Sequence, residues 1–266
     1  GKEVIKYFAD TQKVSNRVAR AKLLKDYVPE ITRVSKHFYS YKFVEAPLLS
    51  NANTDTFKRF LDFMQASLWQ PMKADNFDDS CMKFYREKTY QRFKQIVMWD
   101  SKGTINGEGI PTVNDMLEDL DWEGLSEGIP CLFHGDPQHE NVLVKQDGTF
   151  CLLDWREDFA GLMYGDVYYD LAKIYHALWV SNEIIRQGKY SIKVDGHSAE
   201  YALGFKDNLL AFKDILEEFI LNNGYNLQKV KVLSALIYLN IAPLYQEPYS
   251  KFLYYFGRKY LYEVTR

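Results

Sequence analysis

Two short apolar segments joined by an Asp-Gly pair constrain this chain more than any other feature of its sequence. The segments are residues 142–144 and 150–153, and residues 145–149 between them contain Asp147-Gly148. Because glycine accepts a positive φ without a Cβ clash, Asp-Gly between apolar runs predicts a tight hairpin turn. The chain is therefore expected to contain a two-stranded antiparallel hairpin whose outer ends lie close together.

Side chains with oxygen atoms flank this hairpin. Asn141 directly precedes the first strand and Asp154 directly follows the second, so the hairpin brings two residues thirteen positions apart to neighbouring strand ends. Asp136 lies a short distance before Asn141. Phosphoryl transfer needs a carboxylate that orients the attacking hydroxyl, oxygen ligands for Mg²⁺ and positive charge near the phosphates. The spacing therefore predicts a phosphoryl-transfer site built on Asp136, Asn141 and Asp154.

The residues around the hairpin also follow the pattern of a known family. Residues 134–141 (HGDPQHEN), followed by an apolar strand and Asp154-Trp155, resemble the His-Gly-Asp-x4-Asn and Asp-Trp motifs of the aminoglycoside phosphotransferase and choline kinase family. Residues 165–172 (GDVYYDLA) resemble that family's later Gly-Asp-x3-Asp-Leu-Ala segment. The resemblance is clear over residues 130–175 and diffuse elsewhere, and it implies a protein-kinase-like fold.

The resemblance implies a role for each residue that matches a motif. Asp136 would be the catalytic base, Asn141 a Mg²⁺ ligand, and Asp154 the main Mg²⁺ ligand bridging phosphate oxygens. His134 would support the catalytic loop, residues 134–141, and Asp166 would brace that loop through hydrogen bonds.

The resemblance extends to nucleotide-binding residues near the start of the chain. Val4-Ile5-Lys6 resembles the strand whose lysine holds the α- and β-phosphates. Residues 41–46 resemble the segment that links the two lobes, where backbone N–H and C=O groups would read the adenine edge. Phe43, Val44 and Glu45 are the implied nucleotide-binding residues there. The family thus implies ATP as co-substrate and Mg²⁺ as cofactor.

Two features of the front segment depart from the family pattern. Family members carry a glutamate on the first helix that pairs with the lysine, whereas the expected helix over residues 16–27 has Asp26, at its far end, as its only acid. The family's phosphate-covering loop should precede Lys6, where the given sequence has only five residues, so either this loop is absent from the given sequence or the protein uses nucleotide differently. These departures favour an alternative function, a catalytically silent kinase-like module that binds nucleotide or a partner protein. The intact set of three oxygen donors favours an active kinase.

Apolar periodicity and capping residues predict the remaining elements. The front should contain a strand over 3–8, a helix over 16–27 capped by Ser15, and strands over 31–34 and 37–45. The rest should be mostly helical, with helices beginning near Asp55 and over 78–98, 112–121, 167–186, 198–222 and 227–240, a buried strand over 131–133, and a loop-like stretch from Gly103.

These elements predict an α+β, two-lobed fold. Residues 1–45 would form a small, truncated β-containing N-lobe with the hinge, and residues 46–266 a mostly helical C-lobe with the embedded hairpin. Because the chain begins with Gly1 rather than Met, we expect it to be part of a longer multidomain chain.

Composition excludes several other classes of protein. With 33 basic and 36 acidic residues the net charge is -3, which argues against bulk nucleic-acid binding. No apolar run approaches the ~18 residues of a membrane span. The three cysteines, at positions 81, 131 and 151, show no metal-binding or disulfide spacing, which favours a reduced, cytoplasmic setting.

The acceptor is the open part of the prediction. Between Lys102 and Lys145 there are nine acids and no Lys or Arg, which indicates either a solvated loop or a negative rim that attracts a cationic substrate. Seven tyrosines between Tyr238 and Tyr262 suit helix packing, a cage for a quaternary amine or stacking on a sugar. We therefore expect an ATP- and Mg²⁺-dependent kinase acting on a hydroxyl of a sugar or sugar derivative, a choline- or ethanolamine-type amino alcohol, or an aminoglycoside.

Overall fold

A computed structural model describes residues 2–266, and Gly1 lies outside the described part. The chain divides into two compact units, one of residues 2–75 and 129–174 and the other of residues 76–128 and 175–266. Every site residue that the sequence predicts belongs to the first unit. No helix among residues 2–266 is both long and apolar enough to cross a membrane. The boundary between an N-lobe and a C-lobe near residue 45 stays a prediction.

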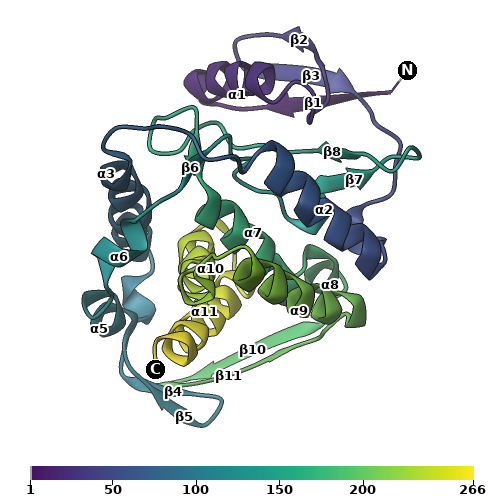
Figure 1. The fold of residues 1–266 in the computed structure, drawn as a ribbon. Coiled ribbons are helices and arrows are strands. Elements are labelled where there is room, and N and C mark those ends of the chain that lie inside the picture. Colours follow the sequence, from purple (N-terminus) through teal and green to yellow (C-terminus); the bar gives the residue numbers. More distant parts are fainter. Residues whose placement is uncertain (1) are drawn as a thin grey trace. The chain divides into compact units, whose positions relative to one another are not determined.

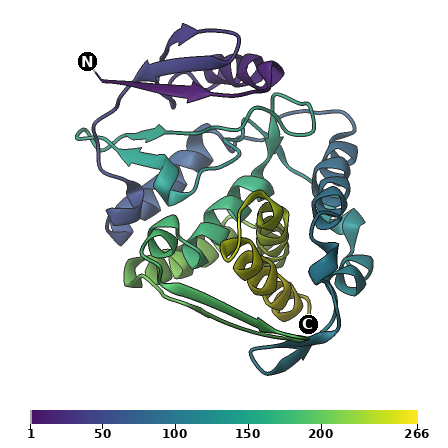
Figure 2. The same ribbon diagram turned by 180° about the vertical axis from the view of Figure 1, so that it is seen from behind.

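The first unit begins with a three-stranded antiparallel sheet. Its strands are β1 (Glu3–Tyr7), β2 (Ile31–Val34) and β3 (Phe38–Lys42), in the order β1-β3-β2. Helix α1 (Thr11–Leu23) covers one face of this sheet (Figures 1 and 2). The predicted front strands are therefore confirmed: β2 has the predicted bounds, β1 ends one residue earlier, and β3 begins one residue later and ends three residues earlier than predicted.

Helix α1 begins about one turn earlier than the sequence predicts. Asp10, rather than Ser15, is the N-cap, and its side chain accepts hydrogen bonds from the backbone N–H groups of Gln12 and Lys13. Ser15 lies inside the helix and donates its hydroxyl proton to the Thr11 carbonyl. Asp is as good a cap as Ser, and the earlier start places Val14 in the buried stripe.

The predicted hairpin is confirmed in the first unit. Strands β7 (Val142–Val144) and β8 (Phe150–Leu152) pair antiparallel, with Leu143 opposite Cys151. Gly148 has φ +79°, and the Lys145 N–H donates to the Thr149 carbonyl at 2.9 Å, which closes the turn. The other α-helices and strands of this unit are α2 (Thr54–Ser67), β6 (Pro130–Cys131), β9 (Gly165–Asp166) and the first part of α7 (Val167–Trp179).

The second unit is mostly helical, and α10 (Leu227–Ile241) and α11 (Tyr249–Thr265) pack side by side at its centre. Its other helices are α3 (Phe77–Met82), α4 (Lys88–Phe93), α5 (Val113–Glu118), α6 (Trp122–Ser126), α8 (Asn182–Arg186) and α9 (Asp207–Asn222), with a π-helical turn over Lys83–Glu87. The π-helical turn and the end of α4 at Phe93 replace the single helix predicted over residues 78–98.

The second unit also contains a sheet that the sequence analysis missed. Strands β4 (Gly103–Ile105), β5 (Glu108–Ile110), β10 (Tyr190–Asp195) and β11 (Ser198–Leu203) lie in the order β10-β11-β4-β5. The prediction of a helix over 198–222 was therefore wrong at its start. Asp195 pairs with Ser198, and Gly196, at φ +57°, forms the two-residue turn between them with His197, so an Asp-Gly pair marks this hairpin as well. Residues 167–186 also break into α7 and α8, because Ser181 caps a new helix.

Candidate active site

Backbone hydrogen bonds join the segments that carry the predicted site. The Leu153 N–H donates to the Asn141 carbonyl at 2.7 Å, which fixes the two outer ends of the hairpin side by side. The Arg156 N–H donates to the His134 carbonyl at 2.9 Å and so ties the chain after Asp154 to the start of the catalytic loop. The hairpin therefore brings the segments of Asp136, Asn141 and Asp154 together, as its Asp-Gly turn indicates.

Asp136 and Asn141 are in direct contact. The Asn141 amide nitrogen donates to the Asp136 carbonyl oxygen at 3.0 Å and to its carboxylate Oδ2 at 3.2 Å. With its nitrogen turned toward Asp136, the amide presents Oδ1 on its other side. This orientation leaves an oxygen of Asn141 available as a ligand for a cation.

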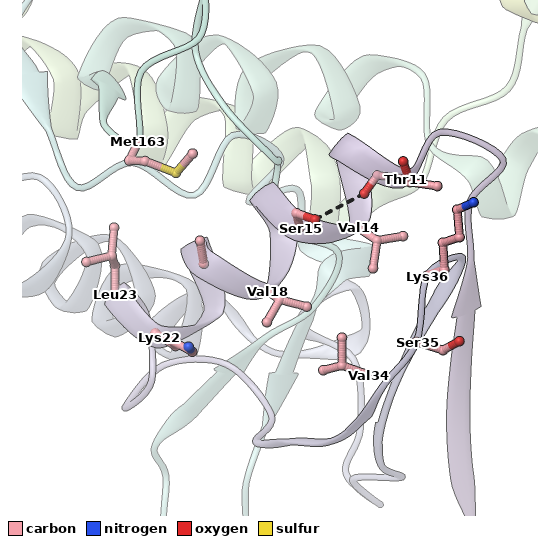
Figure 3. A pocket seen from close by; sticks show the side chains of 11 residues that line it. Thr11, Val14, Ser15, Val18, Lys22, Leu23, Val34, Ser35, Lys36 and Met163 are labelled. Atoms are coloured by element: carbon pink, nitrogen blue, oxygen red, sulfur yellow. Dashed lines mark hydrogen bonds between the residues drawn. The ribbon is translucent and has the colours of Figure 1, made fainter.

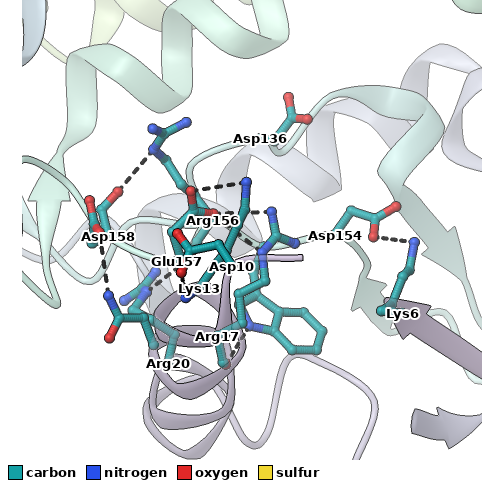
Figure 4. A network of polar contacts seen from close by, with 12 residues as sticks. Lys6, Asp10, Lys13, Arg17, Arg20, Asp136, Asp154, Arg156, Glu157 and Asp158 are labelled. Carbon is teal, nitrogen blue, oxygen red and sulfur yellow. Dashed lines mark hydrogen bonds and ion pairs between the residues drawn. The ribbon is translucent and has the colours of Figure 1, made fainter. Parts of the chain in front are cut away.

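Asp154 forms an ion pair with Lys6 (Figure 4). Lys6 reaches from β1, and Asp154 stands just after β8 in a left-handed backbone conformation, at φ +57°. Both side chains are partly exposed, by 28% for Lys6 and 38% for Asp154. The partner of Lys6 is thus the predicted metal ligand, and not an acid of helix α1.

Helix α1 supplies cations, where the family pattern places an acid. Lys13 and Arg17 pair with Glu157 at 3.3 and 3.2 Å (Figure 4). Burial raises the pKa of the Glu157 carboxyl, but the charge of Arg156 and the Glu157 backbone N–H, with smaller contributions from Arg17 and Lys13, outweigh it, and the net pKa is lowered. Trp155, fully buried, donates its indole N–H to the Arg17 carbonyl at 2.8 Å. Cations on α1 therefore hold an acid in the chain after Asp154, whereas the family pattern has an acid on this helix that pairs with a lysine.

Arg20 extends this anchor to the catalytic loop. Its guanidinium is fully buried and donates to the carbonyl oxygens of Phe133, Arg156 and Met163. Burial lowers the pKa of Arg20 to about 10, which leaves it charged at neutral pH. One side chain of α1 thus holds three loop segments of the first unit.

His134 is a buried, neutral side chain in contact with the backbone of Asp136. It is fully buried, and its Nδ1 accepts the Asp136 N–H at 3.2 Å. Burial, together with the nearby Arg20 and Arg17, lowers the pKa of His134 to about 3. The contact suits the supporting role that the resemblance implies.

The hydrogen bonds from α7 to the catalytic loop come from Asp170, whose role the sequence analysis missed. Its carboxylate accepts the N–H groups of His134 at 2.8 Å and Gly135 at 2.6 Å, and the indole N–H of Trp69 at 3.0 Å. Burial raises the pKa of Asp170 to about 6. Its place in the Asp-Leu-Ala motif was the sequence signal.

Asp166 makes its hydrogen bonds next to the strand that enters the loop. Its Oδ1 accepts the N–H groups of Ile129 at 2.9 Å and Tyr168 at 3.1 Å. Its contribution to the catalytic loop itself stays a prediction.

The predicted hinge residues connect β3 to the hairpin. The Phe43 N–H donates to the Lys2 carbonyl at 3.0 Å, and the Val144 N–H donates to the Pro47 carbonyl at 2.9 Å. Between these points, the backbones of Val44 and Glu45 form no hydrogen bond with another residue in the described range 2–266. Their polar groups are free to meet a ligand edge, and their role in nucleotide binding stays a prediction.

A groove of about 600 Å³ runs along α1, away from these residues (Figure 3). Val14, Val18 and Leu23 of α1 line it together with Val34, and Met163 contributes from the loop before β9. None of the predicted site residues lines this groove, so we assign it no part in the chemistry.

The donor set of the predicted site fits Mg²⁺. Within residues 2–266 no group of three His, Cys, Asp or Glu side chains is arranged to hold a metal ion. The predicted ligands are of a different kind, because they combine the carboxylate of Asp154 with the amide oxygen of Asn141. Both are hard oxygen donors of the type that Mg²⁺ prefers.

A scan against family models relates this chain to known proteins. The model described as the phosphotransferase enzyme family (APH) matches residues 68–202, just over half of the chain, including the catalytic loop and residues 165–172. No curated protein matches the chain in sequence.

Solved structures show the same fold at low sequence identity. An ethanolamine kinase from Plasmodium vivax is 9% identical, with 99% of this chain and 76% of that one covered and a TM-score of 0.51. Choline kinase LicA from Streptococcus pneumoniae is 15% identical, with 97% and 85% covered and a TM-score of 0.51. A complex of LicA with AMP is 13% identical, with 98% and 84% covered and the same TM-score. The α+β, kinase-like fold that the motifs imply is therefore confirmed.

Proposed function

This chain belongs to the phosphotransferase enzyme family, and we propose that it transfers the γ-phosphoryl group of ATP to a hydroxyl group of a small molecule. The observation that carries the proposal is the contact of Asn141 with Asp136, beside the Asp154–Lys6 ion pair. It brings the proposed base, the proposed metal ligands and the proposed phosphate-binding cation together in one unit of the fold. These are the parts that phosphoryl transfer requires.

Each residue has a distinct role in this proposal. Asp136 orients the acceptor hydroxyl, Asn141 Oδ1 and Asp154 hold Mg²⁺, and Lys6 neutralises phosphate charge. Bound Mg²⁺ neutralises the charge that develops on the phosphate oxygens. In the structure described here Lys6 and Asp154 neutralise each other, and we propose that Mg-ATP engages both groups.

The nucleotide would bind against the hinge. Phe43, Val44 and Glu45 are the proposed residues, since the backbones of Val44 and Glu45 have no hydrogen-bond partner in the described range. A structural relative binds AMP, which supports a nucleotide site in this fold.

The acceptor is proposed only as a class of alcohol. The candidates are sugars and their derivatives, amino alcohols such as choline and ethanolamine, and aminoglycosides. The structural relatives include a choline kinase and an ethanolamine kinase, but at 9–15% identity they support the fold and leave the acceptor to experiment.

An ADP-release assay over these three groups of acceptors, with Mg-ATP, tests the proposal. We expect at least one acceptor to stimulate ADP release and D136N to lower kcat by roughly 10²–10⁴-fold, because general-base steps contribute about that much. D214N, which changes an exposed aspartate of α9 in the other unit, is the matched control and should keep wild-type activity.

Two results would contradict the proposal. Wild-type turnover by D136N would remove Asp136 from the chemistry. Nucleotide binding that needs no Mg²⁺, together with no ADP release for any acceptor, would support the catalytically silent module instead.

A further inference from the structure

A buried lysine contacts the proposed base. Lys173 lies on α7, and its ammonium group is 2.8 Å from Asp136 Oδ1. Its side chain is only 11% exposed. Burying an ammonium group is costly unless it is paired, and the contact with Asp136 offsets part of this cost.

The two oxygens of the Asp136 carboxylate therefore have different surroundings. Oδ1 is buried and faces Lys173. Oδ2 accepts the Asn141 amide N–H, and the side chain as a whole is 29% exposed. Because Oδ1 is enclosed, Oδ2 is the oxygen that can meet an acceptor hydroxyl.

Lys173 supplies a charge that the catalytic loop lacks. Residues 137–140 (PQHE) contain no Lys or Arg. Burial and the charge of Arg156 both disfavour the ammonium form, but Asp136 and Tyr169 outweigh them, and the net pKa of Lys173 is raised. The charged ammonium group of Lys173, on α7, thus lies next to the carboxylate of Asp136.

We infer that Lys173 is a positioning residue for phosphoryl transfer, which holds Asp136 through Oδ1 so that Oδ2 faces the acceptor. The inference rests on the proposed function. In the step, the acceptor oxygen bonds to the γ-phosphorus, the bond from that phosphorus to the β–γ bridging oxygen breaks, the hydroxyl proton passes to Asp136 Oδ2, and ADP leaves. The fixed ammonium group keeps the proton from being taken up on Oδ1.

Kinetics of K173M and K173R, with the best acceptor from the ADP-release assay, test this inference. We expect K173M to lower kcat by about 10²-fold, the order reported for a misplaced catalytic group, with the KM for ATP changed less than about threefold. K173R keeps the charge and should retain at least about a tenth of the wild-type kcat. K206M is the matched control, because Lys206 forms a 2.7 Å ion pair with Glu183 in the other unit.

A double variant separates positioning from general structural damage. If Lys173 acts through Asp136, K173M should change the residual rate of D136N less than about twofold, because residues that act as a unit are not additive. Thermal unfolding of each variant identifies any that fail to fold. If K173M fails to fold, the effect of K173R on the wild-type rate is compared with its effect on the residual rate of D136N.

The failures of the two proposals look different. An inactive wild type would overturn the proposed function and this inference together. An active wild type with an unchanged K173M would overturn this inference alone. An additive loss in the D136N background would do the same, since it would show that Lys173 acts independently of Asp136.

Discussion

His134 shows what burial does to a single residue of the site. Its pKa is about 3 in the folded protein, against about 6.5 in an unfolded chain. Between these values the unfolded chain binds more protons than the folded one, so stability falls as the pH is lowered through this window. The loss approaches about 1.4 kcal/mol per pH unit. Neutral His134 can accept the Asp136 N–H on Nδ1, and protonated His134 cannot.

H134N should remove this pH dependence, because an asparagine can also accept the Asp136 N–H and does not titrate. We expect the free energy of unfolding of the wild type, minus that of H134N, to fall as the pH drops from 6.5 to 4.5. Urea unfolding at several pH values measures this difference. The raised pKa of Asp170 has the opposite sign, since its stabilising effect is lost as the pH rises toward 6, but it is common to both proteins and cancels. If the free energies of unfolding of the wild type and H134N changed equally with pH, the assignment of a neutral His134 would be contradicted.

At the scale of elements, helix α1 acts as a clamp on the loops of the first unit. Lys13 and Arg17 bind Glu157, and Arg20 binds three carbonyl groups. The loop after Asp154 contains two acids, Glu157 and Asp158. The cations on α1 and the acids of this loop therefore have opposite charges. The clamp keeps the backbone on both sides of Asp154 in place without a glutamate on the helix.

R20M should therefore destabilise the first unit strongly. The variant leaves the carbonyl groups of Phe133, Arg156 and Met163 without this donor; the first contact is buried and the other two are partly buried. An unsatisfied buried group costs about 1–3 kcal/mol. We expect a loss of at least about 3 kcal/mol in the free energy of unfolding, measured by chemical denaturation. R33M is the control, because Arg33 is 73% exposed and its pair with Glu3, at 3.7 Å, should contribute less than about 1 kcal/mol. Equal stability of the two variants would show that Arg20 is not a clamp.

At the scale of the whole molecule, nucleotide and metal binding should appear as added stability. A ligand that binds only the folded state stabilises it by about 2.7 kcal/mol at one hundred times its Kd. The proposed site joins Lys6, Asn141 and Asp154 from separate parts of the chain, so it exists only in the folded protein.

ATP with Mg²⁺ should therefore raise the melting temperature more than ATP with a chelator. D154N should remove most of the difference, because it removes the main proposed metal ligand. Differential scanning fluorimetry over a series of ATP concentrations measures the shifts, with D214N as control. A shift that is the same with and without Mg²⁺ would contradict the proposed metal site.

Local sequence determined the parts of the structure that depend on neighbouring residues. The Asp147-Gly148 turn predicts the hairpin, and the hairpin predicts that Asn141 and Asp154 come together, because a strand pair of known register leaves no other placement for its ends. The strands over 190–203 are also joined by an Asp-Gly pair, Asp195-Gly196, which is typical of a hairpin. The apolar spacing of the following residues instead favours the helix that the sequence analysis predicts over 198–222.

Only the tertiary structure decided which distant side chains meet. Lys6 pairs with Asp154, Arg20 reaches Phe133, Asp170 holds the loop at His134, and Lys173 faces Asp136. Each of these contacts joins residues tens to more than a hundred positions apart. Their partners depend on how helices and loops pack around a shared core, and packing is a property of the whole fold that no single stretch of residues encodes.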